Sequence, residues 1–360
     1  MATVPLDVQI LIIEWLYRSS QAQTIDYSSL CACALVCRSW TPTAQRLLLR
    51  RAPCPLSWCD HSWHFTIPLL LRTLRANSYL ATLVHSVHLT LFARTASDSD
   101  GPEIELLQLC PNIAGISNSI ILTECDDRLT SLEPRLRAIP LRPVFLQVGD
   151  SERTICNRIV QMWPSLVSLD IKTWCYENEA LLPIHLSSAV QSFTLSYALD
   201  PDIAILAPEN GLPALRTLEL VYPTWSDVQW SDVQCRTIHE LQVLPQLHTL
   251  ILGRIPPPKI LTQLSRLKTL VFNCLPAEPV SLPQTLQHVG YHADSYAWEK
   301  AKDVMLFAPA LWALTHLQLV TVMRCSRQTL LKKACRERGV EFRVYKTTEH
   351  HPRVPNVDWI

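Results

Sequence analysis

The chain has 360 residues, of which 48% are hydrophobic and 18% are charged, and this composition excludes an intrinsically disordered protein. Lys plus Arg and Asp plus Glu both number 32, so the net charge is zero. We therefore expect no nucleic-acid partner, because such binding needs an excess of positive charge. Only 7 glycines occur, and the absence of GxGxxG and GxxxxGK[ST] argues against a nucleotide-binding loop.

The cysteines and the amino terminus bear on the compartment. The 13 cysteines lack the spacing of a disulfide framework, and the first residues lack a signal-peptide pattern. The apolar run over residues 10–13 ends at Glu14, far short of the ~20 residues that span a bilayer. We expect a reduced protein of the cytoplasm, the nucleus or both, with no membrane association.

Residues 5–18 have the apolar periodicity of a helix with two opposed apolar faces. Pro5 suits its first turn, because the missing N–H has no helical partner there. One stripe contains Val8, Leu11, Ile12, Trp15 and Leu16, and the rival stripe, about 180° away, contains Leu6, Ile10, Ile13 and Tyr17. Both stripes must be covered if the helix is to be stable in water.

Two further short helices are predicted before residue 50. Asp26 can cap a helix through residues 30–37, and Thr41-Pro42 suits the start of another helix. Three such helices enclose too little interior to cover both stripes of the first one. The second stripe is covered either by the following domain or by another protein, and the spacing leaves both readings open.

From residue 83 onward one apolar pattern recurs: an apolar residue, two others, an apolar residue, one other, and a third apolar residue. Most copies start roughly 20 to 30 residues apart, which is typical of proteins that stack one strand and one returning segment per repeat. The copies are Val84-Val87-Leu89, Leu166-Leu169-Ile171, Val190-Phe193-Leu195, Leu215-Leu218-Leu220, Leu247-Leu250-Leu252, Leu267-Leu270-Phe272, Leu286-Val289-Tyr291 and Leu317-Val320-Val322, with weaker ones at Ile113-Ile116-Asn118 and Leu141-Val144-Leu146. Gly339 is expected to cap a last helix, and Val340-Phe342-Val344 to form a final strand.

The amino-terminal residues resemble the F-box pattern, which begins with a Leu-Pro pair and an acid and ends in Val-Cys-x-x-Trp. The matching segments are Val4-Pro5-Leu6-Asp7-Val8, Ile12-Ile13-Glu14-Trp15-Leu16 and Leu35-Val36-Cys37-Arg38-Ser39-Trp40. Val4 stands where Leu is usual, and the connection over residues 18–29 is longer than typical. The resemblance covers residues 4 to about 48 of the chain.

The F-box resemblance implies that these helices bind a Skp-type adaptor and, through it, a cullin–RING ubiquitin ligase. Carried over by position, it implies an adaptor-binding surface made by Pro5, Val8, Ile12, Leu16, Val36, Cys37 and Trp40, with Leu6, Ile10 and Ile13 as the rival set. Which stripe of the first helix faces the adaptor stays open. The implied role is recruitment of a target protein, and no catalytic residue is expected.

The repeats resemble an irregular leucine-rich repeat that lacks the usual asparagine ladder. The expected fold is α/β: a three-helix F-box followed by an irregular leucine-rich-repeat solenoid with a curved parallel sheet. The expected domains are residues 1–50 (F-box-like), 51–82 (connector), 83–346 (solenoid) and 347–360 (tail). A different solenoid, or an α/β layer with a parallel sheet, is the structural alternative.

Strand side chains that point away from the core are expected to line a concave interaction face. We expect contacts to a target protein from Asp170, Lys172, Glu219, Asn273 and His292. Cys54, Cys59, His61 and His64 have zinc-competent side chains, but they are too closely spaced for a structural finger, so no metal or other cofactor is expected. The alternative function is a leucine-rich-repeat scaffold without a ligase role.

Overall fold

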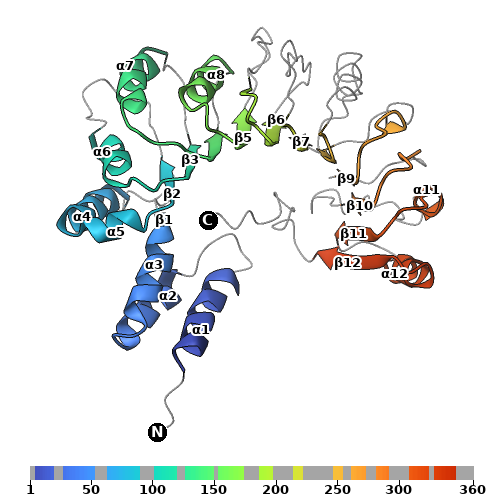
Figure 1. The fold of residues 1–360 in the computed structure, drawn as a ribbon, viewed down its shortest axis with the longest axis horizontal. Coiled ribbons are helices and arrows are strands. Elements are labelled where there is room, and N and C mark those ends of the chain that lie inside the picture. Colours follow the sequence, from blue (N-terminus) through green and yellow to red (C-terminus); the bar gives the residue numbers. More distant parts are fainter. Residues whose placement is uncertain are drawn as a thin grey trace. The chain divides into compact units, whose positions relative to one another are not determined.

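The computed structural model describes residues 5–19, 27–52, 63–89, 101–119, 126–149, 153–173, 186–197, 214–221, 246–253, 261–272, 281–291, 308–323 and 328–345. The chain divides into two compact units, Met1–Gln147 and Val148–Ile360, and the division falls within strand β4 (Phe145–Gly149). Each unit combines helices with parallel strands, so the predicted α/β class is confirmed (Figure 1).

The first unit begins with three helices, where the sequence predicts three: α1 (Leu6–Ser19), α2 (Tyr27–Val36) and α3 (Thr41–Arg50). Pro42 sits in the first turn of α3, where a missing N–H costs no hydrogen bond. The Thr41 hydroxyl donates to the Ala34 carbonyl at 2.8 Å and thereby ties the start of α3 to α2. The chain passes directly from α3 into a first short strand.

The strands of the first unit lie side by side in chain order: β1 (Arg51–Ala52), β2 (Ser86–Leu89), β3 (Gly115–Ser119) and β4. The pairs β1–β2 and β2–β3 are parallel. Four helices alternate with them along the chain: α4 (Trp63–Ala76), α5 (Ser78–Thr82), α6 (Gly101–Leu109) and α7 (Asp126–Arg137). The range predicted as a connector therefore contains β1, α4 and α5, and the predicted domain boundaries stay predictions.

The second unit continues with strands that are again ordered as in the chain. They are β5 (Ser168–Thr173), β6 (Ser192–Tyr197), β7 (Thr217–Val221), β8 (Thr249–Leu252), β9 (Thr269–Phe272), β10 (His288–Tyr291), β11 (Leu319–Met323) and β12 (Glu341–Tyr345). All seven adjacent pairs from β5 to β12 are parallel. The helices described in this unit are α8 (Arg153–Met162), α11 (Ala308–Trp312) and α12 (Gln328–Glu337).

Two apolar rows cross the strands of the second unit and form its core. The register aligns the second apolar position of each repeat into one row and the third into another. Buried members of these rows are Leu169, Phe193, Leu218, Leu250, Leu270, Val289 and Val320, and Ile171, Leu195, Leu220, Leu252, Phe272, Tyr291 and Val322. Each repeat thus covers the apolar side chains of its neighbours, as stacking of incomplete units requires.

The strand at residues 145–149 begins later than the sequence predicts. The weak repeat copy at Leu141-Val144-Leu146 placed Leu146 in the third apolar position. In the structure Leu146 and Val148 are the buried pair, and the Ala114 carbonyl accepts from the Val144 and Phe145 amides at 2.7 and 3.0 Å. The copy is shifted by two residues because buried Pro143 takes the first apolar position.

The end of α12 confirms the predicted glycine cap. Gly339 has φ 71°, a left-handed conformation that suits a residue without a side chain. The Val340 amide donates to the Cys335 carbonyl at 2.9 Å and the Gly339 amide to the Arg336 carbonyl at 3.1 Å, which is the Schellman arrangement. The predicted final strand follows at once as β12.

Candidate protein-interaction surface

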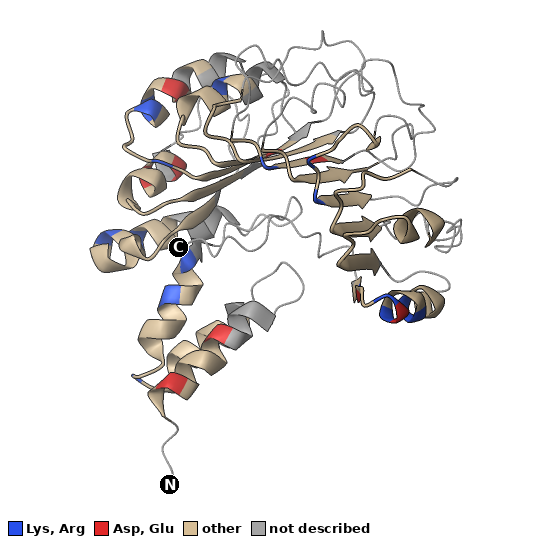
Figure 2. Cartoon of the chain, turned by 45° about the vertical axis from the view of Figure 1, so that its right-hand side comes forward, with Lys and Arg blue, Asp and Glu red and all other residues tan. Residues whose placement is uncertain are grey.

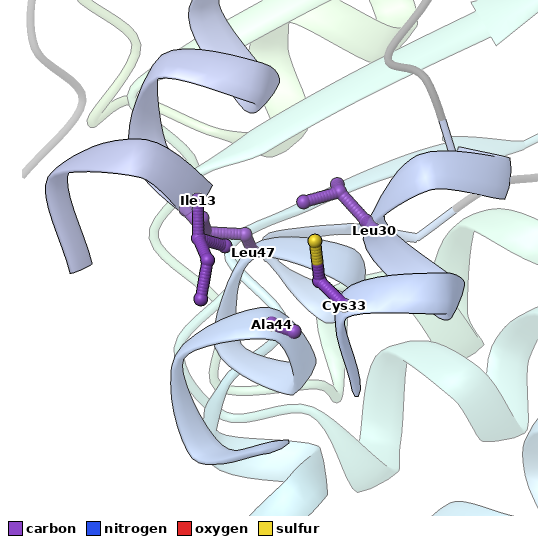
Figure 3. Packing of buried hydrophobic residues seen from close by; sticks show 5 residues of the cluster. All are labelled: Ile13, Leu30, Cys33, Ala44 and Leu47. Atoms are coloured by element: carbon purple, nitrogen blue, oxygen red, sulfur yellow. The ribbon is translucent and has the colours of Figure 1, made fainter. Parts of the chain in front are cut away.

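One apolar stripe of α1 packs inside the three-helix group. The Ile13 side chain is 1% exposed and lies in a cluster with Leu30, Cys33, Ala44 and Leu47 from α2 and α3. Figure 3 shows these five side chains converging from the three helices. Burial raises the pKa of the Cys33 thiol, as expected for a cysteine that acts as a small core residue. Within the stripe that contains Ile13, Ile10 is also partly buried, so this side of α1 faces the interior from Ile10 onward, whereas Leu6 in the first turn is exposed.

The other stripe of α1 is exposed. Leu11 is 63% exposed, and Val8 and Ile12 of the same stripe are exposed as well. Leu6, in the first turn of the Ile13 stripe, is also exposed. Single exposed apolar residues are ordinary on protein surfaces, but a run of them along one short helix marks an interaction site. The described part of the chain thus leaves one of the two predicted apolar stripes uncovered.

The carboxyl-terminal end of α2 adds two more exposed apolar side chains. Leu35 is 86% exposed, and Val36 is also exposed. Cys37 follows them at the surface, and its Sγ lies 3.1 Å from Ser39 Oγ. That hydrogen bond lowers the pKa of the Cys37 thiol.

Hydrogen bonds hold the segment after α2 against the first half of α1. Trp40 Nε1 donates to Gln9 Oε1 at 2.6 Å, and Ser39 Oγ donates to the same oxygen at 3.1 Å. Gln9 lies directly after exposed Val8 on α1, while Ser39 and Trp40 follow shortly after exposed Val36. The two groups of exposed apolar side chains are therefore brought to the same part of the molecule. We call Leu6, Val8, Leu11, Ile12, Leu35 and Val36 the exposed helical patch.

The ion pair between Arg46 and Glu14, with 3.3 Å between Nη2 and Oε1, joins α3 to α1 on the solvent side. Such exposed pairs contribute little free energy, typically below about 1 kcal/mol. Packing of Ile13 and the hydrogen bonds of Gln9 are therefore the main fixed points of α1 in this group.

The predicted adaptor-binding residues divide into three sets. Pro5, Leu6, Val8, Ile12, Val36 and Cys37 are exposed, whereas Ile10 and Trp40 are partly buried and Ile13 is fully buried. Leu16 lies in α1, and its side chain is outside the described residues. Leu35 and Leu11 join the exposed set although they were not among the predicted contacts, and their apolar character alone could have signalled them. The hydrogen bonds of Gln9 have no signal in the sequence, because they join residues about thirty positions apart.

The predicted target-binding residues lie deeper than the sequence suggested. Glu219 is 4% exposed, and Asp170 and the neighbouring Ser168 and Ser192 are buried too. Thr194 Oγ1 donates to Glu219 Oε2 at 3.2 Å. Close parallel pairing explains this burial, because side chains on β5, β6 and β7 are shielded by those of the adjacent strands. The Lys172 side chain, Asn273 and His292 lie outside the described residues.

The side chains that the structure describes contain no group of three His, Cys, Asp or Glu residues that could hold a metal ion. The side chains of Cys54, Cys59, His61 and His64 lie outside that part of the chain. None of the helices that the structure describes is long and apolar enough to cross a bilayer.

Comparisons with known proteins add no relative. A scan against models of protein families gives no match, and a search of curated proteins finds no significant similarity.

Proposed function

We propose that the protein recruits a target to a ubiquitin ligase of the Skp–cullin–F-box type. In this proposal α1, α2 and α3 are an F-box that binds a Skp-type adaptor, and the parallel strands, as an irregular leucine-rich repeat, hold the target. No residue of the chain acts as an acid, base or nucleophile. The rate gain comes from the effective concentration of the target near the ubiquitin-charged enzyme.

The exposed helical patch is the observation that carries this proposal. The Ile13 stripe stabilises the three-helix group, so the opposite stripe with Val8, Leu11 and Ile12 is left for a partner. The sequence did not decide which stripe of α1 faces the adaptor. In this proposal it is the exposed stripe. The Val-Cys-x-x-Trp segment supports the same reading, because Trp40 fixes α1 rather than reaching into solvent.

The free energy gained by burying the exposed side chains of α1 is large enough for a stable complex. Burial of four aliphatic side chains of α1 yields roughly 6–12 kcal/mol at about 1.5–3 kcal/mol each. Lost translational and rotational freedom takes a large share of that. The contribution of Leu35 and Val36 from α2 then decides whether the net affinity is useful, so both helices should contact the adaptor.

Binding of the purified full chain to a purified Skp-type adaptor tests the proposal, with co-elution in gel filtration as the readout. Wild type should co-elute, and Ile12→Asp should abolish co-elution because it places a charge in the buried centre of the interface. Leu330→Asp is the matched control, since Leu330 is an exposed leucine on α12 far along the chain. The control should bind like wild type.

Two outcomes would overturn the proposal. Wild type that fails to bind the adaptor removes the ligase role. Equal binding by wild type and Ile12→Asp shows that any association does not use the exposed helical patch. Circular dichroism must show that wild type and Ile12→Asp are both folded. A second patch variant, Leu35→Asp, repeats the test on α2.

A further inference from the structure

A row of equivalent residues runs along the amino-terminal edge of the strands in the second unit. Each member lies one residue before the start of its strand, from β5 to β12. The row is uncharged at both ends and basic in the middle. In order from β5 to β12 it reads Val167, Gln191, Arg216, His248, Lys268, Gln287, Gln318 and Val340.

Backbone hydrogen bonds give the members of the row the same geometry. The Arg216 carbonyl accepts from the His248 and Thr249 amides, both at 3.0 Å. The His248 carbonyl accepts from the Lys268 and Thr269 amides, both at 2.9 Å. Neighbouring strands lie about 4.8 Å apart, so Arg216 and Lys268 leave the backbone about 10 Å from each other with His248 between them. We call these three residues the basic row.

Among the described residues around it, the basic row carries two of the three exposed charges. Within the described residues between 186 and 323, the charged side chains are Arg216, Arg266 and Lys268, all exposed, and Glu219, which is buried. In this described part of the chain the exposed charges are therefore all positive, although the chain as a whole has no net charge. The next residue along each strand is Thr217, Thr249 or Thr269, and each is partly buried.

We propose that the basic row binds an acidic segment of a partner protein, with carboxylate side chains facing Arg216, His248 and Lys268. Arginine and lysine provide the donors that carboxylates prefer, and charge complementarity at an exposed rim mainly sets specificity and association rate. Neutral glutamines on both sides, Gln191 and Gln287, limit the contact to the three central strands.

A peptide fits this row better than a nucleic acid does. Duplex DNA presents one phosphate charge per about 1.7 Å of its axis, and its binding proteins cover many phosphates with a broad basic surface. The basic row spans only about 10 Å and belongs to a chain of zero net charge. A few carboxylates of an extended segment match both its length and its charge.

The inference stands on the second unit alone and does not depend on the exposed helical patch. If the protein recruits targets to a ligase, the acidic segment belongs to the target. If adaptor binding fails, the basic row still predicts an acidic partner, so the two proposals can fail separately.

Fluorescence anisotropy with the full chain tests the inference, with a labelled peptide of alternating Glu and Ser as the probe and the Gln–Ser peptide as its uncharged match. The double variant Arg216→Gln with Lys268→Gln gives the row the glutamines already found in its neighbours. It should weaken binding of the acidic peptide by about five- to ten-fold, the range expected for two exposed ion pairs. The control, Lys332→Gln with Arg336→Gln, removes two exposed charges from α12, whose Lys and Arg residues Figure 2 shows, and should change binding less than about two-fold.

Three results would overturn the inference. One is no binding of the acidic peptide to wild type at a concentration on the order of millimolar. Another is an equal loss in the row variant and the α12 control, which would show attraction to general surface charge. The third is tighter binding of a single-stranded RNA of the same charge, with the same loss in the row variant, which would make the row a nucleic-acid site.

Discussion

In the strands of the second unit both apolar rows are buried, whereas in α1 only one of two apolar stripes is covered. A repeat is covered by similar neighbours on either side, so stacking supplies the apolar partner surface that each unit needs. Three short helices have no such supply, and once Ile13 is enclosed the opposite side of α1 meets solvent. Exposed apolar surface in a small helical group therefore points to a partner, while the same residue types in the strands only stabilise the fold.

The largest effect should come from the strand core. Phe193→Ala removes a fully buried ring and should lower the free energy of unfolding by about 3–5 kcal/mol, measured by urea denaturation. Val344→Ala in the last strand, where the side chain is 39% exposed, should change it by less than about 1 kcal/mol. Similar values for the two variants would mean that the rows are not the core of this unit.

Neighbouring isoleucines of α1 sharpen the comparison within one helix. Ile13→Ala should destabilise the protein by about 2–4 kcal/mol, because it opens a cavity among Leu30, Cys33 and Leu47. Ile12→Ala should cost less than about 1 kcal/mol in the same urea experiment, since Ile12 is exposed. A larger loss for Ile12→Ala than for Ile13→Ala would show that the Ile13 side of α1 is not the internal one.

A partly buried histidine makes the strand stack sensitive to acid. Burial lowers the pKa of His288 to about 4, with help from the charge of Arg343, and His288 Nε2 lies 2.9 Å from Thr321 Oγ1. The unfolded chain, with an ordinary histidine pKa near 6.5, then binds more protons than the folded one between about pH 4 and 6.5. Stability is full above that window and should fall by up to about 3 kcal/mol as the pH drops through it.

His288→Gln is the variant that checks this dependence. It cannot take up a proton, so its free energy of unfolding should vary less with pH between 4 and 6.5 than that of wild type. Chemical denaturation at a series of pH values measures the difference. Identical slopes for the two proteins would show that His288 does not carry the acid sensitivity.

The smallest effect concerns the link between α1 and the segment after α2. Gln9→Ala leaves Trp40 Nε1 and Ser39 Oγ without this acceptor and should cost about 1–2 kcal/mol in urea denaturation. Gln9→Glu keeps an acceptor oxygen and should cost less. If both variants are as stable as wild type in urea, packing and not these hydrogen bonds holds the two parts of the exposed helical patch together.

Much of the strand stack was predictable from the sequence, while the candidate sites were less so. The apolar triplets predicted the strands of the second unit, because the same local pattern recurs in each repeat. The copy at residues 141–146 was misplaced by two residues because Pro143, not a leucine, fills the first apolar position. The burial of Asp170 and Glu219 was not foreseen, since it depends on the side chains of adjacent strands.

The sequence by itself determined the three amino-terminal helices, the two apolar stripes of α1 and the left-handed end of α12 at Gly339, because these follow from local periodicity and backbone sterics. Only the tertiary structure decided which stripe is internal, because that depends on where α2 and α3 place Leu30 and Leu47. It also decided that position 290 has room for glycine alone, since a Cβ there would lie 2.7 Å from Thr321 Oγ1. The basic row is decided in the same way: Arg216, His248 and Lys268 are distant in the chain and become neighbours only through parallel pairing of their strands.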